Sequence, residues 1–316
     1  MKSAVCTLFE KHYHFGLAIL VNSLYRNGFR GDVFVGYRGE LPEWTNGRLE
    51  NAALNWENAT TLPVKDGLQI HFLPVDIDYQ FTNYKPIFML RLYDGPGSDL
   101  DAIAYFDPDI VLKCKWSFFE TWMGYGVALV HEIVSNDMPP THPIRREWEK
   151  VIAKCDRTVT RQLNSYMNAG FCGVTKENKE FLSLWVHIME IGRLHFNMED
   201  KDFQFTNSRM DIFFAKDQDA MNIAAMCSES PISEMGPEAM DFANGGFTMA
   251  HAVGAAKPWR KKYLSSALRG IPPVSADKAF WLNTNGPLLP YTSAQMKRKK
   301  MALTVASLIG RFYKRN

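Results

Sequence analysis

The sequence predicts an α/β fold in which a largely parallel sheet is flanked by helices. Five short apolar runs have the length and composition of buried strands: residues 4–8, 32–37, 69–75, 102–106 and 127–130. Helical stretches lie between them, the clearest at 15–25 and 84–93. Because a parallel pair of strands needs a long crossover connection, usually a helix, this alternation predicts a parallel sheet.

Both helices have recognisable boundaries. Residues 15–25 form an apolar run that Asn27 and Gly28 end, as residues tolerant of the left-handed conformation commonly do. Residues 84–93 carry Pro86 in their first turn, where a missing amide N–H is tolerated. The 316 residues can bury a large core, so we expect one elaborated domain or a domain with an appendage.

Composition and charge exclude several classes of protein. A hydrophobic content of 46% with 22% charged residues is that of a globular chain rather than a disordered one. The five cysteines are scattered without a Cys-x-x-Cys pair, which argues against a zinc site or a disulfide framework and favours a reducing compartment. The first residues lack the pattern of a secretory signal and no apolar run is long enough to span a membrane, so we expect a cytoplasmic protein.

The positive charge is concentrated at the end of the chain. Residues 294–316 hold seven Lys or Arg and no acid, and subtracting these seven from the net charge of +2 leaves about −5 for the rest. A body with a negative balance does not suit nucleic acid, and we expect no nucleic-acid partner.

Two carboxylates follow the predicted strand 102–106. Asp107 and Asp109 are separated only by Pro108. In parallel α/β sheets, ligands bind beyond the carboxyl ends of the strands, which favours a functional role. A turn with solvated Asp side chains is the alternative for so short a pattern.

A second stretch supplies the groups that would complete such a site. His251, Gly254 and Lys257 follow one another at three-residue steps, ahead of Pro258 and Trp259. Imidazole and carboxylate bind a divalent ion such as manganese. Glycine lets a backbone approach phosphate closely, and lysine supplies a point charge for it. A metal and a phosphate clamp together are what a nucleoside-diphosphate leaving group requires, so the two stretches predict that chemistry.

Two further blocks carry polar groups. An Asn-Ala-Gly sequence stands at 168–170, and the Asn168 amide can donate and accept at once, which suits sugar hydroxyls. A turn into a strand is the structural alternative there. An Asp-Gln-Asp sequence at 217–219 opens an apolar helical stretch, where an N-terminal cap and a site role can coexist.

In this order the four blocks resemble the retaining family-8 glycosyltransferases, the group that contains glycogenin and bacterial lipooligosaccharide galactosyltransferases. The resemblance covers about residues 4 to 263. It implies a GT-A fold, a UDP-sugar donor and a bound Mn²⁺ or Mg²⁺. The activity that it implies is transfer of a hexose to a glycan or glycolipid acceptor with retention of configuration.

The resemblance also assigns roles to residues. It implies metal ligation by Asp107, Asp109 and His251, and contacts from Gly254 and Lys257 to the diphosphate. The remaining donor-binding residues that it implies are Cys6, Thr7, Glu10, Tyr13, Lys85, Phe106, Asp107, Asn168 and Ala169. Arg91 is the rival of Lys85 as the basic donor-site residue on its helix.

The chemistry at the anomeric carbon stays open between a carboxylate nucleophile and same-face attack. Asp217 and Gln218 are expected to face that carbon, and Glu132, which follows strand 127–130, is a further candidate for contact with sugar hydroxyls or acceptor. A nucleotide-sugar-binding protein and a UDP-sugar hydrolase are the alternatives. A pyrophosphorylase is disfavoured because its glycine-rich, arginine-containing phosphate loop is absent near the N-terminus.

The acceptor is expected to meet a rim formed by segments 135–165 and 192–212. The residues that could contact an anionic acceptor there are Thr141, His142, Pro143, Arg145 and Arg146. A solvated loop is the alternative.

We predict a catalytic domain at 1–263 and an extension at 264–316, joined through the Pro- and Gly-dotted segment 270–292. In the extension a polar stripe recurs at helical spacing: Lys297, Lys300, Thr304, Ser307, Arg311 and Lys314. A broad apolar face lies away from it: Met301, Val305, Leu308, Ile309 and Phe312. A basic amphipathic helix suits an anionic membrane surface, so we expect peripheral membrane association. A helix docked on the core with solvated charges is the alternative.

Overall fold

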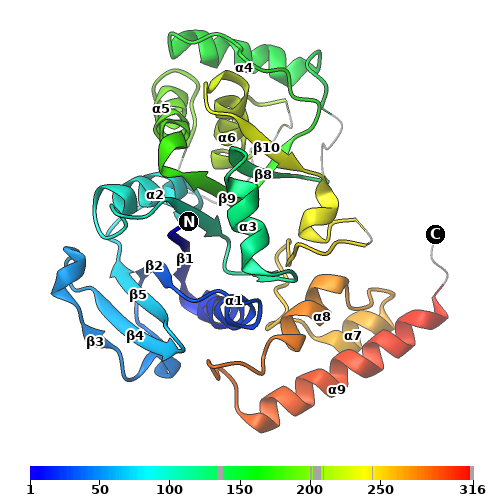
Figure 1. Ribbon diagram of the computed structural model, residues 1–316. Coiled ribbons are helices and arrows are strands. Elements are labelled where there is room, and N and C mark those ends of the chain that lie inside the picture. The colour runs from blue at the N-terminus through cyan, green and yellow to red at the C-terminus, as the bar shows by residue number, and fades with distance from the viewer. Residues whose placement is uncertain (134–137, 200, 202–207, 209, 244, 314–316) are drawn as a thin grey trace.

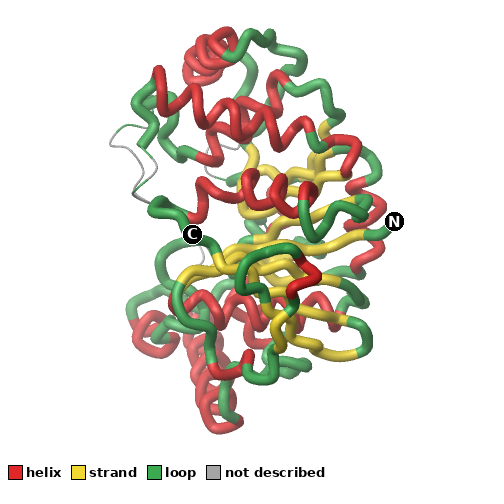
Figure 2. The backbone as a smooth tube through the Cα atoms, turned by 90° about the vertical axis from the view of Figure 1, so that its left-hand side faces the viewer, coloured by secondary structure: helices red, strands yellow, loops and turns green. Residues whose placement is uncertain are grey.

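The computed structural model describes residues 1–133, 138–199, 201, 208, 210–243 and 245–313. Its centre is a nine-stranded sheet with the order β10-β8-β9-β6-β1-β2-β5-β4-β3, and β7 and β11 form a separate two-stranded sheet. Helices lie on either side of the strand layer, as Figures 1 and 2 show. The predicted α/β fold with a mostly parallel sheet is therefore confirmed.

The strands are β1 (Ser3–Glu10), β2 (Asp32–Arg38), β3 (Leu49–Glu50), β4 (Thr60–Lys65), β5 (Leu68–Pro74), β6 (Ala102–Phe106), β7 (Ile110–Leu112), β8 (Val127–His131), β9 (Met167–Thr175), β10 (Ile232–Met235) and β11 (Met249–His251). The α-helices are α1 (His14–Arg26), α2 (Lys85–Asp94), α3 (Trp116–Met123), α4 (Pro143–Lys154), α5 (Glu180–His195), α6 (Asp217–Cys227), α7 (Tyr263–Leu268), α8 (Ser275–Leu282) and α9 (Ser293–Ile309).

Strand direction brings the carboxyl ends of several strands to one edge. β1 runs parallel to both β2 and β6, and β8 runs parallel to β10. β9 pairs antiparallel with β6 and with β8, so it enters the sheet at the edge where β6 and β8 end. The start of β9 and the ends of β1, β6 and β8 therefore meet at the same edge.

The two faces of the sheet bury separate hydrophobic clusters. Along β1, Cys6 and Leu8 face one cluster, which includes side chains of α2 and α5, whereas Val5 and Phe9 face the other, which includes side chains of α1 and α3. This alternation follows from the two-residue period of a strand. Because both faces are covered, the central strands are apolar throughout, which is the pattern that made them recognisable in the sequence.

The extension packs on the same part of the molecule as α1 and the small sheet. A third cluster joins Tyr263, Trp281 and Leu303 to Ile19 of α1 and to Trp259. In Figure 1, α7, α8 and α9 gather at the end of the molecule that also holds α1, away from α4. The boundary between 263 and 264 stays a prediction, but this shared cluster means that the extension supports the segment around Trp259.

Helix α9 has two apolar faces with different surroundings. Leu303 and Ala306 are buried against the third cluster. The second face is formed by Met301, Val305 and Leu308 and is continued by Phe312 in the turn after the helix; these side chains are 42% to 89% exposed. Part of the predicted apolar face therefore stays in contact with solvent while the helix is docked on the core. Lys314 of the predicted polar stripe lies outside the described residues.

Among the described residues, no helix combines the length and the apolar character needed to cross a bilayer.

Candidate functional site

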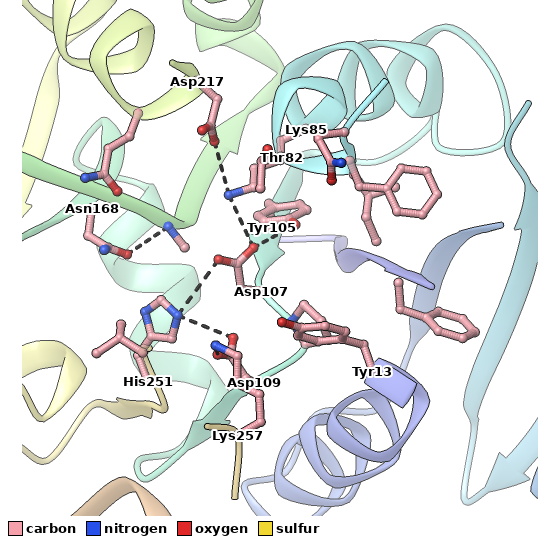
Figure 3. Close-up of a pocket in the computed structure, with 18 of the residues that line it drawn as sticks. Tyr13, Thr82, Lys85, Tyr105, Asp107, Asp109, Asn168, Asp217, His251 and Lys257 are labelled. Carbon is pink, nitrogen blue, oxygen red and sulfur yellow. Dashed lines mark hydrogen bonds and ion pairs between the residues drawn. The ribbon is translucent and has the colours of Figure 1, made fainter. Parts of the chain in front are cut away.

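A pocket of about 480 Å³ opens at the edge where the strand ends meet. The structure brings twelve of the residues predicted from sequence to its wall: Glu10, Tyr13, Lys85, Asp107, Asp109, Glu132, Asn168, Asp217, Gln218, His251, Gly254 and Lys257. They come from elements spread over most of the chain, and Figure 3 shows the labelled ones, among them Lys85, Asp107 and His251, with their side chains turned toward a common space. The four blocks of the sequence therefore form one site.

The two carboxylates lie on a tight turn between β6 and β7. The amide of Asp107 donates to the carbonyl of Gly170 on β9 at 2.7 Å, and the amide of Ile110 donates to the carbonyl of Asp107 at 3.0 Å. The turn also lies directly against α1, because a Cβ on Gly16 would approach the carbonyl oxygen of Pro108 to 2.3 Å. Glycine at position 16 therefore allows the helix to support the turn from behind.

His251 reaches the carboxylates through the small antiparallel sheet. It pairs in register with Ile110, which stands one residue after Asp109. Its Nε2 lies 3.3 Å from Asp109 Oδ1 and 3.8 Å from Asp107 Oδ2. A Cβ on Gly170 would come within 2.4 Å of the imidazole, so the absence of a side chain there makes room for the ring.

These three residues fit a divalent cation. One ligand atom from each of Asp107, Asp109 and His251 lies within 4.8 Å of the others, as a shared ion requires. Two carboxylates and one imidazole suit Mn²⁺ or Mg²⁺ rather than a thiol-preferring metal. His251 Nδ1 is buried and has no hydrogen-bond partner among the described residues, so Nε2 is the nitrogen aimed at the carboxylates.

Lys257 forms the closest ion pair of the site. Its Nζ lies 2.5 Å from Asp109 Oδ2 and donates to the carbonyl of Ala252 at 3.1 Å. Burial alone would raise the pKa of Asp109, but His251 and the Lys257 ammonium hold that pKa well below its usual range. Burial alone would lower the pKa of Lys257, and Asp109 raises it instead. Both groups therefore stay charged near neutral pH.

Lys85 is a second buried cation, placed between two acids. Its Nζ lies 3.3 Å from Asp107 Oδ1 and 3.3 Å from Asp217 Oδ2, and it donates to the carbonyl of Ala169 at 3.0 Å. Burial would lower the pKa of Lys85, but the two carboxylates raise it. Arg91, the rival from sequence, is exposed, donates to Tyr84 and does not line the pocket. Lys85, and not Arg91, is therefore the cation of α2 that lines the pocket.

Asp217 is the acid whose ionisation the fold disfavours. The net pKa of Asp217 is raised to about 6. Burial is the largest cause, the neighbouring Asp107 carboxylate adds to the rise, and the Lys85 ammonium opposes it. A carboxyl group with a pKa so close to neutrality is common at functional sites. Asp217 is the first residue of α6 and the N-cap position is Lys216, so the predicted capping role of Asp217 is wrong. Its carboxyl group lines the pocket, and its role at the site stays a prediction.

Asn168 and Gln218 connect β8, β9 and α6 through hydrogen bonds at one wall of the pocket. Asn168 accepts from the amide of Gly170 at 2.8 Å and donates from its Nδ2 to Glu132. Gln218 Oε1 accepts from the amide of Ala169 at 2.9 Å. The start of β9 is thus tied to the end of β8 and to the first turn of α6, which fixes the distance between Glu132 and Asp217 across the pocket.

The first loop forms another wall of the pocket. Glu10 ends β1 and accepts from Arg38 at 2.8 and 3.0 Å. Tyr13 stands edge-on to Trp259, with ring centroids 5.6 Å apart, and the Trp259 indole donates to His12 at 3.0 Å. These contacts connect the first loop to the segment that carries His251 and Lys257.

Four predicted donor-binding residues do not line the pocket: Cys6, Thr7, Phe106 and Ala169. Cys6 and Phe106 are fully buried in the two clusters that cover the sheet faces. Thr7 is buried as well, and Ala169 contributes its backbone, which bonds to Lys85 and Gln218. Cys6, Thr7 and Phe106 lie on strands, and their side chains are buried away from the pocket wall.

The structure adds pocket residues that the sequence reading missed. Gln80, Phe81 and Thr82 come from the turn after β5, and Tyr105 donates to Asp107 at 2.9 Å. The position of residues 80–82 between a predicted strand and a predicted helix was the available signal, since such loops lie at the carboxyl edge of a parallel sheet.

The suggested acceptor contacts have varied surroundings. Arg145 is completely buried and donates to the carbonyls of Met138 and Ser165 at 2.8 and 2.7 Å, so it braces two loops. Arg146 is exposed and pairs with Glu149. Residues 135–137, 200, 202–207 and 209 of the suggested rim lie outside the described residues. The acceptor rim stays a prediction.

The fold is that of known glycosyltransferases. The bifunctional glycosyltransferase WbbM in its apo form superposes with a TM-score of 0.58 at 15% identity over 95% of this chain, which spans about half (52%) of WbbM. The galactosyltransferase LgtC with donor and acceptor sugar analogues superposes with a TM-score of 0.50 at 13% identity, over 94% of this chain and 99% of LgtC. An active-site variant of LgtC gives 0.53 at 12% identity, over 92% and 98%.

No protein-family profile and no curated protein matches the sequence. The structural neighbours therefore define the class by fold alone, and the GT-A glycosyltransferase fold that the motifs predicted is confirmed.

The pKa of Asp217 predicts how stability depends on pH in the metal-free protein. Because the folded-state pKa of about 6 exceeds the usual 3.8, the contribution of protonated Asp217 to the free energy of unfolding is complete below pH 4 and is lost as pH rises through 6. The Asp217→Asn variant has no ionisable group at this position. Its free energy of unfolding relative to that of the natural protein should therefore increase by about 2 kcal/mol between pH 4 and 7. Thermal melting in EDTA measures it, with the exposed Asp78→Asn as control. A difference that does not change with pH would contradict the burial argument.

Proposed function

We propose that this protein is a metal-dependent glycosyltransferase that moves a hexose from a UDP-sugar to a glycan or glycolipid acceptor with retention of configuration. The observation that supports it most is the cluster of Asp107, Asp109 and His251 within 4.8 Å, beside Lys257, in a pocket of a glycosyltransferase fold. This is the set of groups that a metal-bound diphosphate requires, and it faces a space large enough for a sugar nucleotide.

The charge of the pocket supports the need for a cation. Five carboxylates line it, from Glu10, Asp107, Asp109, Glu132 and Asp217. Two lysines, Lys85 and Lys257, accompany them. A diphosphate would be repelled by that excess of negative charge, because interactions between charges are strong where water is largely excluded. A divalent ion bound by the carboxylates would offset the negative charge on that side of the pocket. Binding of the sugar nucleotide should therefore depend on the metal.

The chemistry of the site follows from the leaving group. As the anomeric bond breaks, negative charge develops on the diphosphate, and Mn²⁺ bound by Asp107, Asp109 and His251 would stabilise that charge. Lys257 is placed at the same end of the pocket and would contact the diphosphate together with the backbone at Gly254. The Gly254 backbone has φ of +91° with open space around it, so phosphate could approach closely.

The opposite wall would hold the sugar. Asp217 and Gln218 lie across the pocket from the metal ligands, and Lys85 connects Asp217 to Asp107. We assign Asp217 and Gln218 to the face of the anomeric carbon. Glu132, held by Asn168, would orient hydroxyls of sugar or acceptor.

Substitution of single metal ligands tests the function. Asp109→Ala or His251→Ala should reduce metal-dependent transfer by about a hundredfold or more, because metal stabilisation of a developing anion amounts to several kcal/mol. EDTA should have the same effect. Exposed residues of the same types supply controls, Asp99→Ala and His187→Ala. The readout is UDP release from UDP-sugars with and without a panel of glycan acceptors.

The outcomes separate the alternatives. UDP release that rises when an acceptor is added supports a transferase. Release that ignores every acceptor indicates a hydrolase, and binding without release indicates a nucleotide-sugar-binding protein. Undiminished transfer in excess EDTA would contradict the metal site.

We further propose that α9 holds the enzyme on an anionic membrane surface that carries its acceptor. The exposed stripe of Met301, Val305, Leu308 and Phe312 is accompanied by exposed Lys297, Arg298 and Arg311. Apolar side chains beside basic ones on one helix suit insertion at the level of lipid headgroups. Each basic residue near such a surface contributes roughly 1 kcal/mol, which salt screens.

Variants of the exposed stripe test this association without disturbing the core. Removal of all of α9 would also remove Leu303 and Ala306 from the third cluster, so point changes are the cleaner choice. The double variant Leu308→Glu, Phe312→Glu should no longer sediment with phosphatidylserine vesicles at low salt. Leu49→Glu, equally exposed but on β3, should sediment like the natural protein. Sedimentation of the double variant, or failure of the natural protein to sediment, would refute the proposal.

A further inference from the structure

Lys257 forms an ion pair with Asp109, one of the proposed metal ligands. Its Nζ lies 2.5 Å from Asp109 Oδ2, while the other oxygen of the same carboxylate lies 3.3 Å from His251 Nε2. The lysine side chain is 11% exposed and that of Asp109 is 4% exposed, so the ion pair is screened little by water. The ammonium therefore neutralises the Asp109 charge from one carboxylate oxygen, while the other oxygen faces His251, where a shared divalent ion would bind.

A divalent ion and this ammonium are poorly compatible as neighbours. An ion bound by Asp107, Asp109 and His251 would lie within a few ångströms of Nζ, and two like charges in a buried site repel strongly. The single negative charge of Asp109 cannot fully neutralise both the Lys257 ammonium and the divalent ion. Metal binding without a donor must therefore weaken or break the Lys257–Asp109 pair and leave a buried ammonium with less compensation, which is costly.

A diphosphate removes this conflict because it gives the ammonium another anion. Lys257 and Gly254 both line the pocket, and the four residues 253–256 between His251–Ala252 and Lys257 are exposed. The backbone of Lys257 is fixed, since its carbonyl accepts from Arg260 and Lys261 at 2.8 and 3.1 Å. A rotation of the side chain is therefore enough to move Nζ from Asp109 toward the phosphates.

We propose that Lys257 makes the site select the pair of divalent metal and nucleoside diphosphate over free metal. Before either ligand binds, the Lys257 ammonium is paired with Asp109 and weakens metal binding. When the diphosphate binds, the ammonium pairs with a phosphate instead, and Asp109 becomes available to the metal. This role rests on the proposed function and adds a specificity-determining property to a residue that would otherwise only bind phosphate.

The exchange makes metal and diphosphate binding mutually dependent. By linkage, the factor by which UDP strengthens Mn²⁺ binding equals the factor by which Mn²⁺ strengthens UDP binding. Part of that factor comes from Lys257. Its removal should raise the affinity for Mn²⁺ alone and reduce the gain that UDP provides.

The test is a titration of Mn²⁺, followed by the electron paramagnetic resonance signal of the free ion, with and without UDP. Lys257→Met should bind Mn²⁺ alone about tenfold more tightly than the natural protein, because a screened charge repulsion at this range readily amounts to the 1.4 kcal/mol of a tenfold change. The UDP-dependent gain should shrink by at least the same factor. Lys257→Arg keeps the charge and should bind Mn²⁺ alone weakly, like the natural protein. The exposed Lys262→Met controls for a Lys→Met change nearby.

The outcomes distinguish this inference from the proposed function. If the natural protein binds Mn²⁺ with UDP, but Lys257→Met binds Mn²⁺ alone no more tightly, the exchange is refuted and the metal–donor site stands. If the natural protein binds no Mn²⁺ even with UDP, both proposals fail. Thermal melting of each variant confirms that the fold is intact.

Discussion

Charge compensation between Asp107, Asp109 and the groups around them is the constraint on which the site depends. Two acids on one tight turn, mostly shielded from water, are stable only with charged or polar partners. The fold supplies them from three directions: the His251 imidazole from the small sheet, the Lys257 ammonium from the segment after it, and the Lys85 ammonium from α2. Under the proposed function, the interactions that compensate these charges are the ones that donor binding would redistribute.

The rest of the architecture keeps this turn in place. Gly16 lets α1 lie against it, Gly170 leaves room for the imidazole, and Trp259 joins the first loop to the segment of Lys257. The extension packs behind Trp259 through Tyr263 and Trp281. The surface helix α9 is thereby connected through continuous packing to the end of the pocket that holds Lys257, so α9 has a structural role whether or not its outer face meets a membrane.

Much of this could be predicted from sequence because the signals were local. The strand at 102–106 has the predicted bounds, and the helices at 15–25 and 84–93 differ by one residue at each end, since apolar runs and turn residues mark them. The ordered blocks identified eight of the twelve predicted pocket residues, and the family resemblance and the end of strand 127–130 supplied the other four. Cys6 and Phe106 were assigned to the donor but lie in the core, because a motif does not reveal which face of a strand a side chain takes. The Lys257–Asp109 ion pair joins residues 148 positions apart, and no local sequence pattern predicts it.

The most direct measurement is anomalous diffraction at the manganese edge from crystals grown with Mn²⁺ and UDP. The account predicts a single strong peak within coordination distance of Asp107, Asp109 and His251, with the UDP diphosphate on its open side and Lys257 Nζ moved from Asp109 to a phosphate oxygen. A peak elsewhere, or ordered UDP in this pocket without any manganese, would contradict it.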